Sequence, residues 1–454
     1  MKLAERGGLH ALAADRLLRD DDFFVAPASD RRFPMPIRFA PCARWLTALC
    51  LAAGSIGVAA APDAALKAAA EKAQPAVIDS LREMVLIESG SSDEAGLARM
   101  AAFTEQRLQA LGFKTERRKA TAGTGADIVI GTLQGTGRKH FMLQAHMDTV
   151  YQPGILKTQP YKVEGGRIYG PGIADDKGGI AVILHSLALL RERGWADFAT
   201  LTVLFNPDEE VGSIGSGETI AALGAQQDVV LSFEPTAAKA VARQEALLLG
   251  AAGTATVTLQ VKGKASHAGA APELGRNALI ELSNQLVQTR DIAKSVPGAQ
   301  LNWTTSQSGT VRNQIPELAT AGADVRTTQN GAAEALNDKL KEAVQRNKVV
   351  PDTETSVQMV IGRPPFVASA AGRALAQRAQ AIYAELDNRP LALVDMTGGA
   401  TDAGFASRSG KAAVVESFGL AGFGYHARDE YIEVDSIVPR LYLATRLLME
   451  LGQP

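Results

Sequence analysis

Five short segments of the sequence carry histidine or carboxylate side chains that could hold a divalent metal ion. They are His146-Met-Asp148, Asp175-Asp176, Glu209-Glu210, Glu234 and His426. The chain has only six histidines, so their presence in two of these segments is notable. Zn²⁺ accepts imidazole nitrogen and carboxylate oxygen as ligands, and two such ions about 3.5 to 4 Å apart form a clamp for hydrolysis. Two histidines and three carboxylates, one of them shared, would give each ion three protein ligands and leave room for a water molecule.

Other kinds of site find little support in the composition. Both cysteines, Cys42 and Cys50, lie in the first fifty residues, so the rest of the chain offers no disulfide, thiolate nucleophile or thiolate ligand. The serine nucleophile pattern Gly-x-Ser-x-Gly is absent, and the glycine pair at 178–179 lacks a phosphate-binding pattern. The formal net charge of −2 does not favour nucleic acid as a partner. With 46% hydrophobic and 21% charged residues, the composition is that of an ordinary globular protein.

The elements that must position these side chains alternate between helical and strand patterns from about residue 64, which is typical of an α/β layered sheet. Short apolar runs predict strands at 140–145, 200–205 and 229–233. Helical spacing predicts two helices within 65–111 and a third over 179–193. Each predicted strand ends at a cluster of His, Asp or Glu. The carboxyl ends of strands are where sites collect in open α/β sheets.

A different pattern begins near residue 253, where residues 254–261 alternate between apolar and polar side chains as a half-exposed strand does. Further elements are predicted at 277–289 (helix), 300–311 and 318–326 (strands), 331–347 (helix) and 354–361 (strand). The order β-α-β-β-α-β is that of a ferredoxin-like unit. After a linker at Arg363-Pro-Pro365, the α/β pattern returns with elements at 370–386, 413–415 and 439–451. We therefore expect a discontinuous catalytic domain, 62–251 and 364–454, interrupted by an inserted domain over 252–363.

The first 61 residues are predicted to be a leader that contains a secretory signal. A basic stretch over 35–44 precedes an apolar run over 45–61 that ends in small residues. The run is too short and too rich in Ala and Gly for a membrane span, which needs about 20 strongly apolar residues, so no stable membrane anchor is expected. Met35 is the expected true start, and Arg31-Arg32 offers a twin-arginine signal if the longer form is made. Both routes lead to a periplasmic or secreted protein.

Six ordered motifs resemble those of the M20 family of zinc metallopeptidases, and within it the glutamate carboxypeptidase type. The matching segments are His146-Met-Asp-Thr-Val-Tyr151, Gly170-Pro-Gly-Ile-Ala-Asp-Asp-Lys-Gly-Gly179, Leu204-Phe-Asn-Pro-Asp-Glu-Glu210, Ser232-Phe-Glu-Pro-Thr236, Gly263-Lys-Ala-Ser-His-Ala-Gly-Ala-Ala-Pro-Glu-Leu-Gly275 and Gly424-Tyr-His426. The resemblance covers roughly residues 70 to 452. It implies a dizinc exopeptidase domain with a mixed central sheet flanked by helices, and an inserted ferredoxin-like lid and dimerisation domain.

The resemblance implies a role for each metal-ligating residue. Asp175 would bridge two zinc ions, His146 and Glu234 would complete one site, and Glu210 and His426 would complete the other. Because the family has a mixed nitrogen and oxygen donor set at each ion, the implied ligands agree with the preferences of zinc.

Two further carboxylates are assigned catalytic work. Glu209 would be the general base, since a carboxylate beside two cations and a water can take the water's proton and later deliver it to the leaving amine. Asp148, two residues after a ligand histidine, would orient that imidazole. In the family the peptide bond between Asp175 and Asp176 is cis, and the same is expected here.

The resemblance also assigns substrate contacts outside the metal cluster. Arg326 would bind the substrate's carboxylate through its guanidinium fork. His267 and Asn313 would lie near the scissile carbonyl and could donate to its oxygen. Gly399 belongs to a substrate-lining turn in which many relatives have three consecutive glycines, whereas this chain has Ala400 in the third position.

The expected function is hydrolysis of a C-terminal amino acid, by preference glutamate, from N-acyl, pteroyl or peptidyl substrates. The expected partner is a small molecule or peptide with a free carboxylate, and the resemblance implies a homodimer through the inserted domain. An N-acyl amino-acid deacylase or dipeptidase of the same family is an alternative that shares the metal core. An inactive extracellular binder of acidic ligands is a second alternative, against which the complete ligand set and the intact Glu209 both argue.

Overall fold

The structure is a computed structural model that describes residues 61–453. The predictions of a leader, a secretory signal and a start at Met35 concern residues that lie outside this range. Among the described helices, none combines the length and the apolar character needed to cross a membrane.

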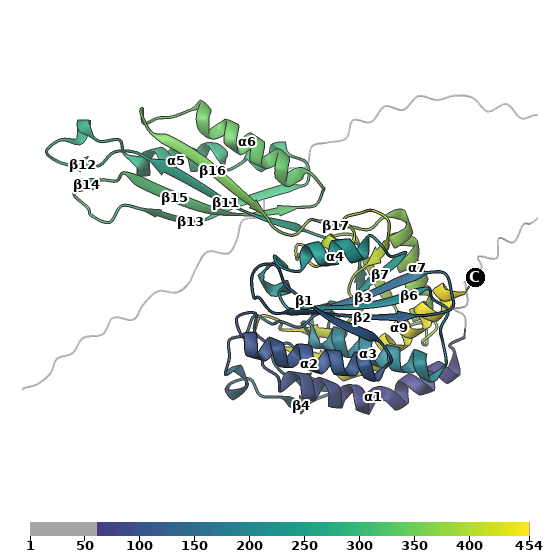
Figure 1. The fold of residues 1–454 in the computed structure, drawn as a ribbon. Coiled ribbons are helices and arrows are strands. Elements are labelled where there is room, and N and C mark those ends of the chain that lie inside the picture. The colour runs from purple at the N-terminus through teal and green to yellow at the C-terminus, as the bar shows by residue number, and fades with distance from the viewer. Residues whose placement is uncertain (1–60, 454) are drawn as a thin grey trace, which may run out of the picture. The chain divides into compact units, whose positions relative to one another are not determined.

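A six-stranded mixed sheet forms the centre of the α/β part of the fold (Figure 1). In order across the sheet, its strands are β1 (Lys114–Lys119), β2 (Asp127–Gln134), β6 (Thr200–Asn206), β3 (His140–His146), β7 (Val229–Ser232) and β19 (Ala413–Val415). The first three are antiparallel neighbours, and β6, β3, β7 and β19 run parallel. Parallel strands buried on both faces consist of nearly continuous apolar residues. This property made the runs at 140–145, 200–205 and 229–233 recognisable in the sequence.

Helices cover the sheet, and α1, α3 and α9 pack side by side on one face of it (Figure 1). The helices are α1 (Ala64–Val85), α2 (Glu94–Ala110), α3 (Lys177–Glu192), α4 (Gly217–Gly224), α7 (Ala370–Ala384), α8 (Ala403–Ala406) and α9 (Ile437–Gly452). The side chains of Asp63, Asp93 and Asp176 cap the first turns of α1, α2 and α3. The Asp176 cap explains why α3 begins two residues before the helix predicted over 179–193.

A second, five-stranded sheet was not predicted because its strands have only two or three residues each. They are β4 (Lys162–Glu164), β5 (Arg167–Tyr169), β21 (Tyr431–Glu433), β20 (Ala421–Phe423) and β8 (Thr236–Ala237), in that order. The α/β part of the fold also contains two small sheets of two strands each. One pairs β9 (Glu245–Leu248) with β18 (Leu391–Val394), and the other pairs β10 (Gly250–Ala251) with β17 (Phe366–Val367). Because β10 and β17 are paired, the chain leaves for the inserted unit and returns from it at neighbouring strands.

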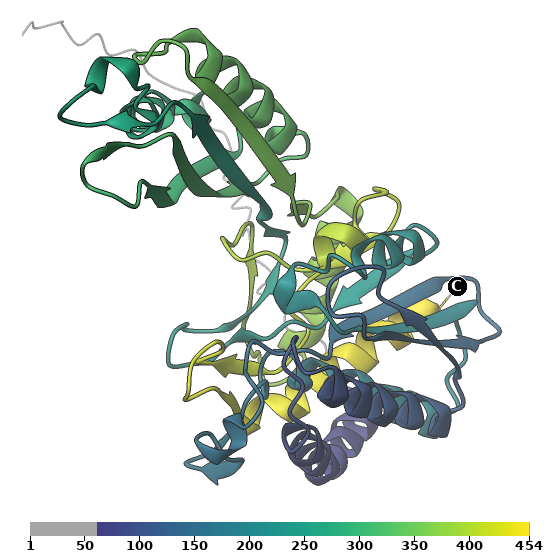
Figure 2. The same ribbon diagram turned by 60° about the vertical axis from the view of Figure 1, so that its left-hand side comes forward.

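The inserted unit contains the predicted β-α-β-β-α-β order (Figure 2). Its elements are β11 (Gly253–Lys262), α5 (Ala278–Thr289), β13 (Ala299–Ser308), β15 (Leu318–Thr327), α6 (Ala332–Arg346) and β16 (Glu354–Ile361), with a short pair of β12 (Ser266–His267) and β14 (Gln314–Ile315). The four long strands form an antiparallel sheet in the order β13-β15-β11-β16. Alternate residues of β11 are buried, which confirms the half-exposed strand inferred from its alternating pattern.

Candidate metal centre

Two groups of described side chains could hold a metal ion, and both contain Asp175. One consists of His146, Asp175 and Glu234, and the other of Asp175, Glu210 and His426. Within each group, one potential ligand atom from every residue lies within 4.8 Å of the others. The structure therefore brings together all five residues that the sequence predicted as ligands, and it divides them between two groups as expected.

The central sheet positions three of these five residues. His146 is the last residue of β3, Glu210 belongs to the short 3₁₀ helix Glu209–Val211 that follows β6, and Glu234 comes two residues after β7. Because β3, β6 and β7 are parallel, their carboxyl ends meet at one edge of the sheet. Asp175 lies just before α3, and His426 lies in the loop between β20 and β21.

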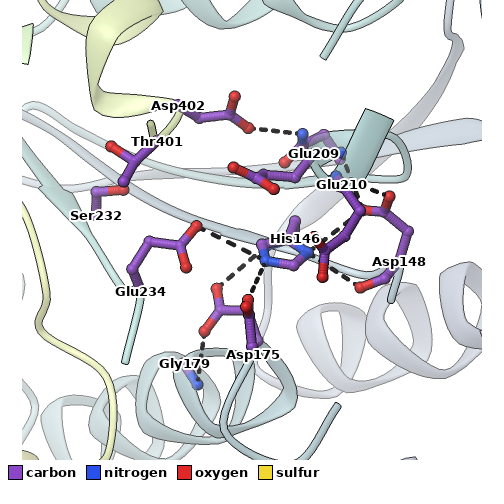
Figure 3. A network of polar contacts seen from close by, with 12 residues as sticks. His146, Asp148, Asp175, Gly179, Glu209, Glu210, Ser232, Glu234, Thr401 and Asp402 are labelled. Atoms are coloured by element: carbon purple, nitrogen blue, oxygen red, sulfur yellow. Dashed lines mark hydrogen bonds and ion pairs between the residues drawn. The ribbon is translucent and has the colours of Figure 1, made fainter. Parts of the chain in front are cut away.

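The carboxylate of Asp175 presents one oxygen to each histidine (Figure 3 shows the His146 half). Its Oδ1 lies 2.8 Å from Nε2 of His146, and its Oδ2 lies 3.5 Å from Nε2 of His426. An oxygen of Glu234 is 3.7 Å from Nε2 of His146, and an oxygen of Glu210 is 3.1 Å from Nε2 of His426. A carboxylate with this geometry can serve as a shared ligand for two cations.

Asp148 is fully buried and holds several parts of the site in place. One of its oxygens lies 3.3 Å from Nδ1 of His146, on the opposite side of the ring from the ligand nitrogen. Its carboxylate also accepts hydrogen bonds from the backbone N–H groups of Glu209 (3.0 Å) and Glu210 (3.1 Å) and from the hydroxyl of Ser91 (2.8 Å). Asp148 thus connects the imidazole of His146 to the loop that carries both glutamates. Nε2, on the other side of the ring, faces the carboxylates of Asp175 and Glu234.

The peptide bond between Asp175 and Asp176 is cis, as the resemblance implied. Asp176 belongs to neither ligand group, and its carboxylate accepts hydrogen bonds from the N–H groups of Gly179 (3.1 Å) and His146 (3.3 Å). A side chain at Gly179 would place its Cβ 2.2 Å from the Asp176 carboxylate and 2.2 Å from the carbonyl oxygen of Phe233. The glycine therefore serves close packing at the start of α3.

Glu430 supports the site and was missed in the sequence. Its buried carboxylate accepts hydrogen bonds from the N–H groups of Gly172 (2.8 Å), Ala174 (2.8 Å) and Asp175 (3.1 Å), and from the hydroxyl of Tyr151 (2.8 Å). These contacts fix the loop that presents Asp175. Burial raises the pKa of Glu430 to about 7. Its position four residues after His426 could not reveal this role from the sequence. The backbone groups that it binds lie more than 250 residues earlier in the chain.

Glu209 is buried beside the cluster, where it contacts a second residue that was missed. Nη2 of Arg363 lies 2.9 Å from Oε1 of Glu209, and Nε of the same arginine lies 3.5 Å from the carboxylate of Asp402. Arg363 also donates a hydrogen bond to the carbonyl oxygen of Ala400 (3.3 Å). From the sequence, Arg363 was expected only to belong to the linker between the two parts of the fold. In the structure it joins the predicted general base to the glycine turn.

The charges of the cluster are suited to cations. Burial raises the pKa values of Glu234, Glu209 and Glu210, because in each case a carboxylate is poorly solvated and has other carboxylates nearby. Burial opposes protonation of His146, but the carboxylates of Glu234, Asp148 and Asp175 raise its pKa well above the ordinary value. Divalent cations would relieve the repulsion among these carboxylates, and the donor set of imidazole and carboxylate agrees with zinc.

The other predicted substrate contacts lie on elements that carry none of the cluster's ligands. Arg326 is on β15 and pairs with Asp324 at 3.0 Å, and Nδ1 of His267 on β12 accepts hydrogen bonds from the following backbone. Asn313 precedes β14, and Gly399 lies in the loop after β18. Among residues 61–453, none of the four forms a hydrogen bond or ion pair with a ligand of the cluster. Their roles stay predictions.

This α/β sheet, with imidazole and carboxylate ligands at the ends of its strands, is the architecture of a metal-dependent hydrolase. Residues 142–450 match the sequence profile of Peptidase family M20/M25/M40, and the chain belongs to this family. The family, the fold class and the metallopeptidase nature predicted from the six motifs are thereby confirmed.

Individual relatives agree with this assignment. The chain is 46% identical to carboxypeptidase G2 of Pseudomonas sp. (strain RS-16) over 391 residues, which are 86% of this chain and 92% of that protein. It is 28% identical to succinyl-diaminopimelate desuccinylase of Novosphingobium aromaticivorans over 74% of this chain and 89% of the relative. Its fold is similar to that of aminopeptidase PepT from Bacillus cereus, with a TM-score of 0.69, 22% identity and coverage of 84% of this chain and 99% of the other.

Proposed function

We propose that the protein is a dizinc carboxypeptidase that releases a C-terminal amino acid, by preference glutamate, from N-acyl, pteroyl or peptidyl substrates. The observation that carries the proposal is the carboxylate of Asp175, which turns one oxygen toward each of two separate ligand groups. The 46% identity to a protein named carboxypeptidase G2 supports the choice of reaction and of the C-terminal residue.

In this proposal the five clustered residues hold two ions. His146 and Glu234 would hold one, Glu210 and His426 would hold the other, and Asp175 would be a ligand of both. Bound zinc would polarise the scissile carbonyl and acidify a water molecule beside it. Glu209 accepts the proton of that water and then delivers it to the nitrogen of the departing amino acid. In the metal-free protein, burial raises the pKa of Glu209 although the guanidinium of Arg363 opposes this shift.

The free carboxylate of the substrate needs a cation to bind it. We propose that Arg326 of the inserted unit provides this cation, with His267 and Asn313 as donors to the carbonyl oxygen and Gly399 lining the pocket. In this division residues 62–251 and 364–454 form the catalytic domain, and 252–363 form a lid. Recognition of a terminal carboxylate would explain why a tail residue is removed in preference to an internal bond being cut.

The test is hydrolysis of a pteroyl-glutamate by purified protein that starts at Ala64. We expect release of glutamate that is lost with a chelator and recovered with zinc, and no release by the Glu209→Gln variant, with its zinc content unchanged. Wild-type turnover by Glu209→Gln, with zinc and substrate bound normally, would overturn the proposed mechanism. A wild-type protein that binds zinc and pteroyl-glutamate but releases no glutamate would favour the inactive-binder alternative.

A deacylase or dipeptidase is the second candidate, and the 28% identity to a succinyl-diaminopimelate desuccinylase favours it over unrelated reactions. A panel of N-acetyl amino acids, neutral dipeptides and N-acyl glutamates separates the candidates. Zinc-dependent cleavage of the first two groups without release of glutamate would keep the metal chemistry and change the substrate.

We also propose a homodimer that forms through the inserted unit in a periplasmic or secreted protein. Leu279, Ile280 and Val287 of α5 leave 44%, 53% and 66% of their surface exposed, which supports an apolar contact on this helix. Light scattering should give twice the chain mass for wild type and a lower mass for Ile280→Asp. Export is tested by fractionation of cells that produce the full chain.

A further inference from the structure

The buried arginine beside the proposed general base, Arg363, turns each of its three side-chain nitrogens toward a different group. Its Nη2 lies 2.9 Å from Oε1 of Glu209, and its Nε lies 3.5 Å from Oδ1 of Asp402. Its Nη1 donates a hydrogen bond to the carbonyl oxygen of Ala400 (3.3 Å). Only 9% of the arginine side chain is exposed, so water weakens these contacts little. The planar fork of a guanidinium group allows all three contacts at once, which the single nitrogen of a lysine does not.

The carboxylate of Glu209 depends on this arginine for its orientation. Within residues 61–453, the guanidinium of Arg363 is the one polar group that pairs with this carboxylate. The backbone of Glu209 is fixed separately, because its N–H donates to Asp148 (3.0 Å). A backbone hydrogen bond does not fix the side-chain torsions of a glutamate. The direction in which the carboxylate points is therefore set by the ion pair with Arg363.

Asp402, the second carboxylate beside Arg363, is held by other groups as well. Its Oδ2 accepts a hydrogen bond from Nδ2 of Asn206 (2.7 Å), and its Oδ1 accepts one from the hydroxyl of Ser213. Asp402 is itself buried. A buried carboxylate with these additional partners keeps its position without the arginine. Asp402 therefore anchors the guanidinium, and the guanidinium in turn orients Glu209.

The backbone of Arg363 is fixed by both parts of the fold. Its N–H donates to the hydroxyl of Thr254 (3.1 Å), and its carbonyl oxygen accepts from the N–H of the same threonine (2.9 Å), which belongs to β11 of the inserted unit. The next residue, Pro364, packs against α8 so closely that a Cβ at Gly404 would lie 2.1 Å from the proline carbonyl oxygen. With its backbone and its guanidinium both fixed, Arg363 is a preorganised support for Glu209.

We propose that Arg363 is a positioning residue for the reaction, which fixes the carboxylate of Glu209 in the orientation that takes the proton from the attacking water. The inference rests on the proposed function, in which Glu209 is the general base, and deepens it by naming the residue that aims this base. Precise placement matters because an error of about 1 Å in the position of a reacting group can lower the rate about 100-fold.

The test is the variant Arg363→Lys, which keeps the positive charge but loses the fork. With pteroyl-glutamate as substrate we expect kcat to fall about 100-fold. Zinc content should not change, and KM should stay within about twofold of wild type, because the group that is lost does not bind the substrate. A kcat within about threefold of wild type would overturn the inference, and a raised KM with unchanged kcat would assign Arg363 to substrate binding instead.

The matched control is Arg408→Lys. Arg408 also forms an ion pair with a glutamate, Glu218, through two nitrogens, but both side chains are exposed and neither belongs to a ligand group. The same chemical change at this pair should leave kcat, KM and zinc content as in wild type. A loss of kcat in Arg408→Lys as large as in Arg363→Lys would show that the effect is not specific to the base, and would overturn the inference.

A crystal structure of the zinc-loaded Arg363→Lys protein separates this inference from the proposed function, because it needs no turnover. We expect the five metal ligands to keep their positions while the carboxylate of Glu209 rotates away from its wild-type orientation. An unchanged Glu209 carboxylate would contradict the positioning role even if glutamate is released as proposed. If Arg363→Lys does not fold, Asp402→Asn takes its place, since it removes the charge that anchors the guanidinium and keeps the shape of the side chain. The same rotation of Glu209 is then expected, and its absence would contradict the inference.

Discussion

The two halves of the metal cluster are built differently, although they share Asp175. His146 ends a central strand, and only 1% of its side chain is exposed, whereas His426 lies in a loop with 55% of its side chain exposed and a φ of +64°. Asp148 holds the ring of His146 from behind. One half of the cluster is therefore part of the core and is positioned by the sheet, while the other half belongs to a loop that solvent can reach.

The largest effect should come from removing the residue that both halves share. In Asp175→Ala each half loses a ligand, so we expect loss of most bound zinc. Without an activated water, Glu209 has no proton to transfer, and that step alone is worth about 10² to 10⁴-fold in rate. Metal analysis and kcat/KM on the same preparation check this. Asp387→Ala, at a highly exposed carboxylate, is the control and should keep both properties. Two retained ions in Asp175→Ala would show that the halves do not share this ligand.

The next effect distinguishes the two halves. Loss of a residue that only supports a metal ligand lowers metal affinity about 10- to 100-fold. His146→Ala removes a buried ligand itself, so its zinc affinity should fall by more than this. His426→Ala should stay within it, because water can reach the vacated position, and added imidazole or excess zinc should restore part of the activity. Zinc titration gives both affinities.

His140→Ala is the control for these histidine variants. Its ring contacts Thr200 at 2.7 Å and is absent from both ligand groups, so zinc affinity should match wild type. Equal losses in His146→Ala and His426→Ala would contradict the distinction between a core half and a loop half.

A smaller effect should follow from loss of the support behind His146. Asp148→Asn keeps the shape of the side chain but removes its charge, and we expect zinc affinity and kcat/KM to fall about 10- to 100-fold. The zinc position beside buried His146 should lose more of its ion than the position beside exposed His426. Site occupancy read from zinc-edge diffraction on crystals of the variant would show which ion is lost. Preferential loss of the ion at His426 would contradict this account.

The smallest predicted effect is one of pH. Hydrogen bonds to Asp175 and Glu210 raise the pKa of His426 in the metal-free protein to about 10. Below that pH the ring carries a proton that an ion must displace. Zinc affinity should therefore rise with pH, by about tenfold per unit for each proton released. Calorimetry of zinc binding between pH 6 and 8, in buffers of different ionisation enthalpy, counts the protons that are released. We expect the His426→Ala variant to release fewer protons than wild type when zinc binds. Equal proton release would contradict the assignment.

The sequence was sufficient to predict the residues whose position follows from regular elements. His146 is the last residue of β3, Glu234 comes two residues after β7, and Glu210 comes four residues after β6. Because these strands are parallel, their carboxyl ends meet at one edge of the sheet. The inserted unit was also predictable, because residues 254–261 alternate and helices follow at helical spacing. In both cases a local pattern determines the position of the side chain.

The supporting residues could not be predicted in this way. Glu430 and Arg363 act through contacts with residues far away in the chain, and nothing in their neighbouring sequence indicates them. The five-stranded sheet was missed because two or three residues give no measurable periodicity. Helix ends differ from prediction by about two residues, as at α7, which ends at Ala384 instead of 386.

The most direct test of the shared ligand is anomalous diffraction at the zinc edge from crystals of the zinc-loaded protein. We predict two peaks about 3.5 to 4 Å apart, one contacted by His146 and Glu234, the other by Glu210 and His426, with an oxygen of Asp175 at each. A single peak, or a second peak that Asp175 does not contact, would contradict the account.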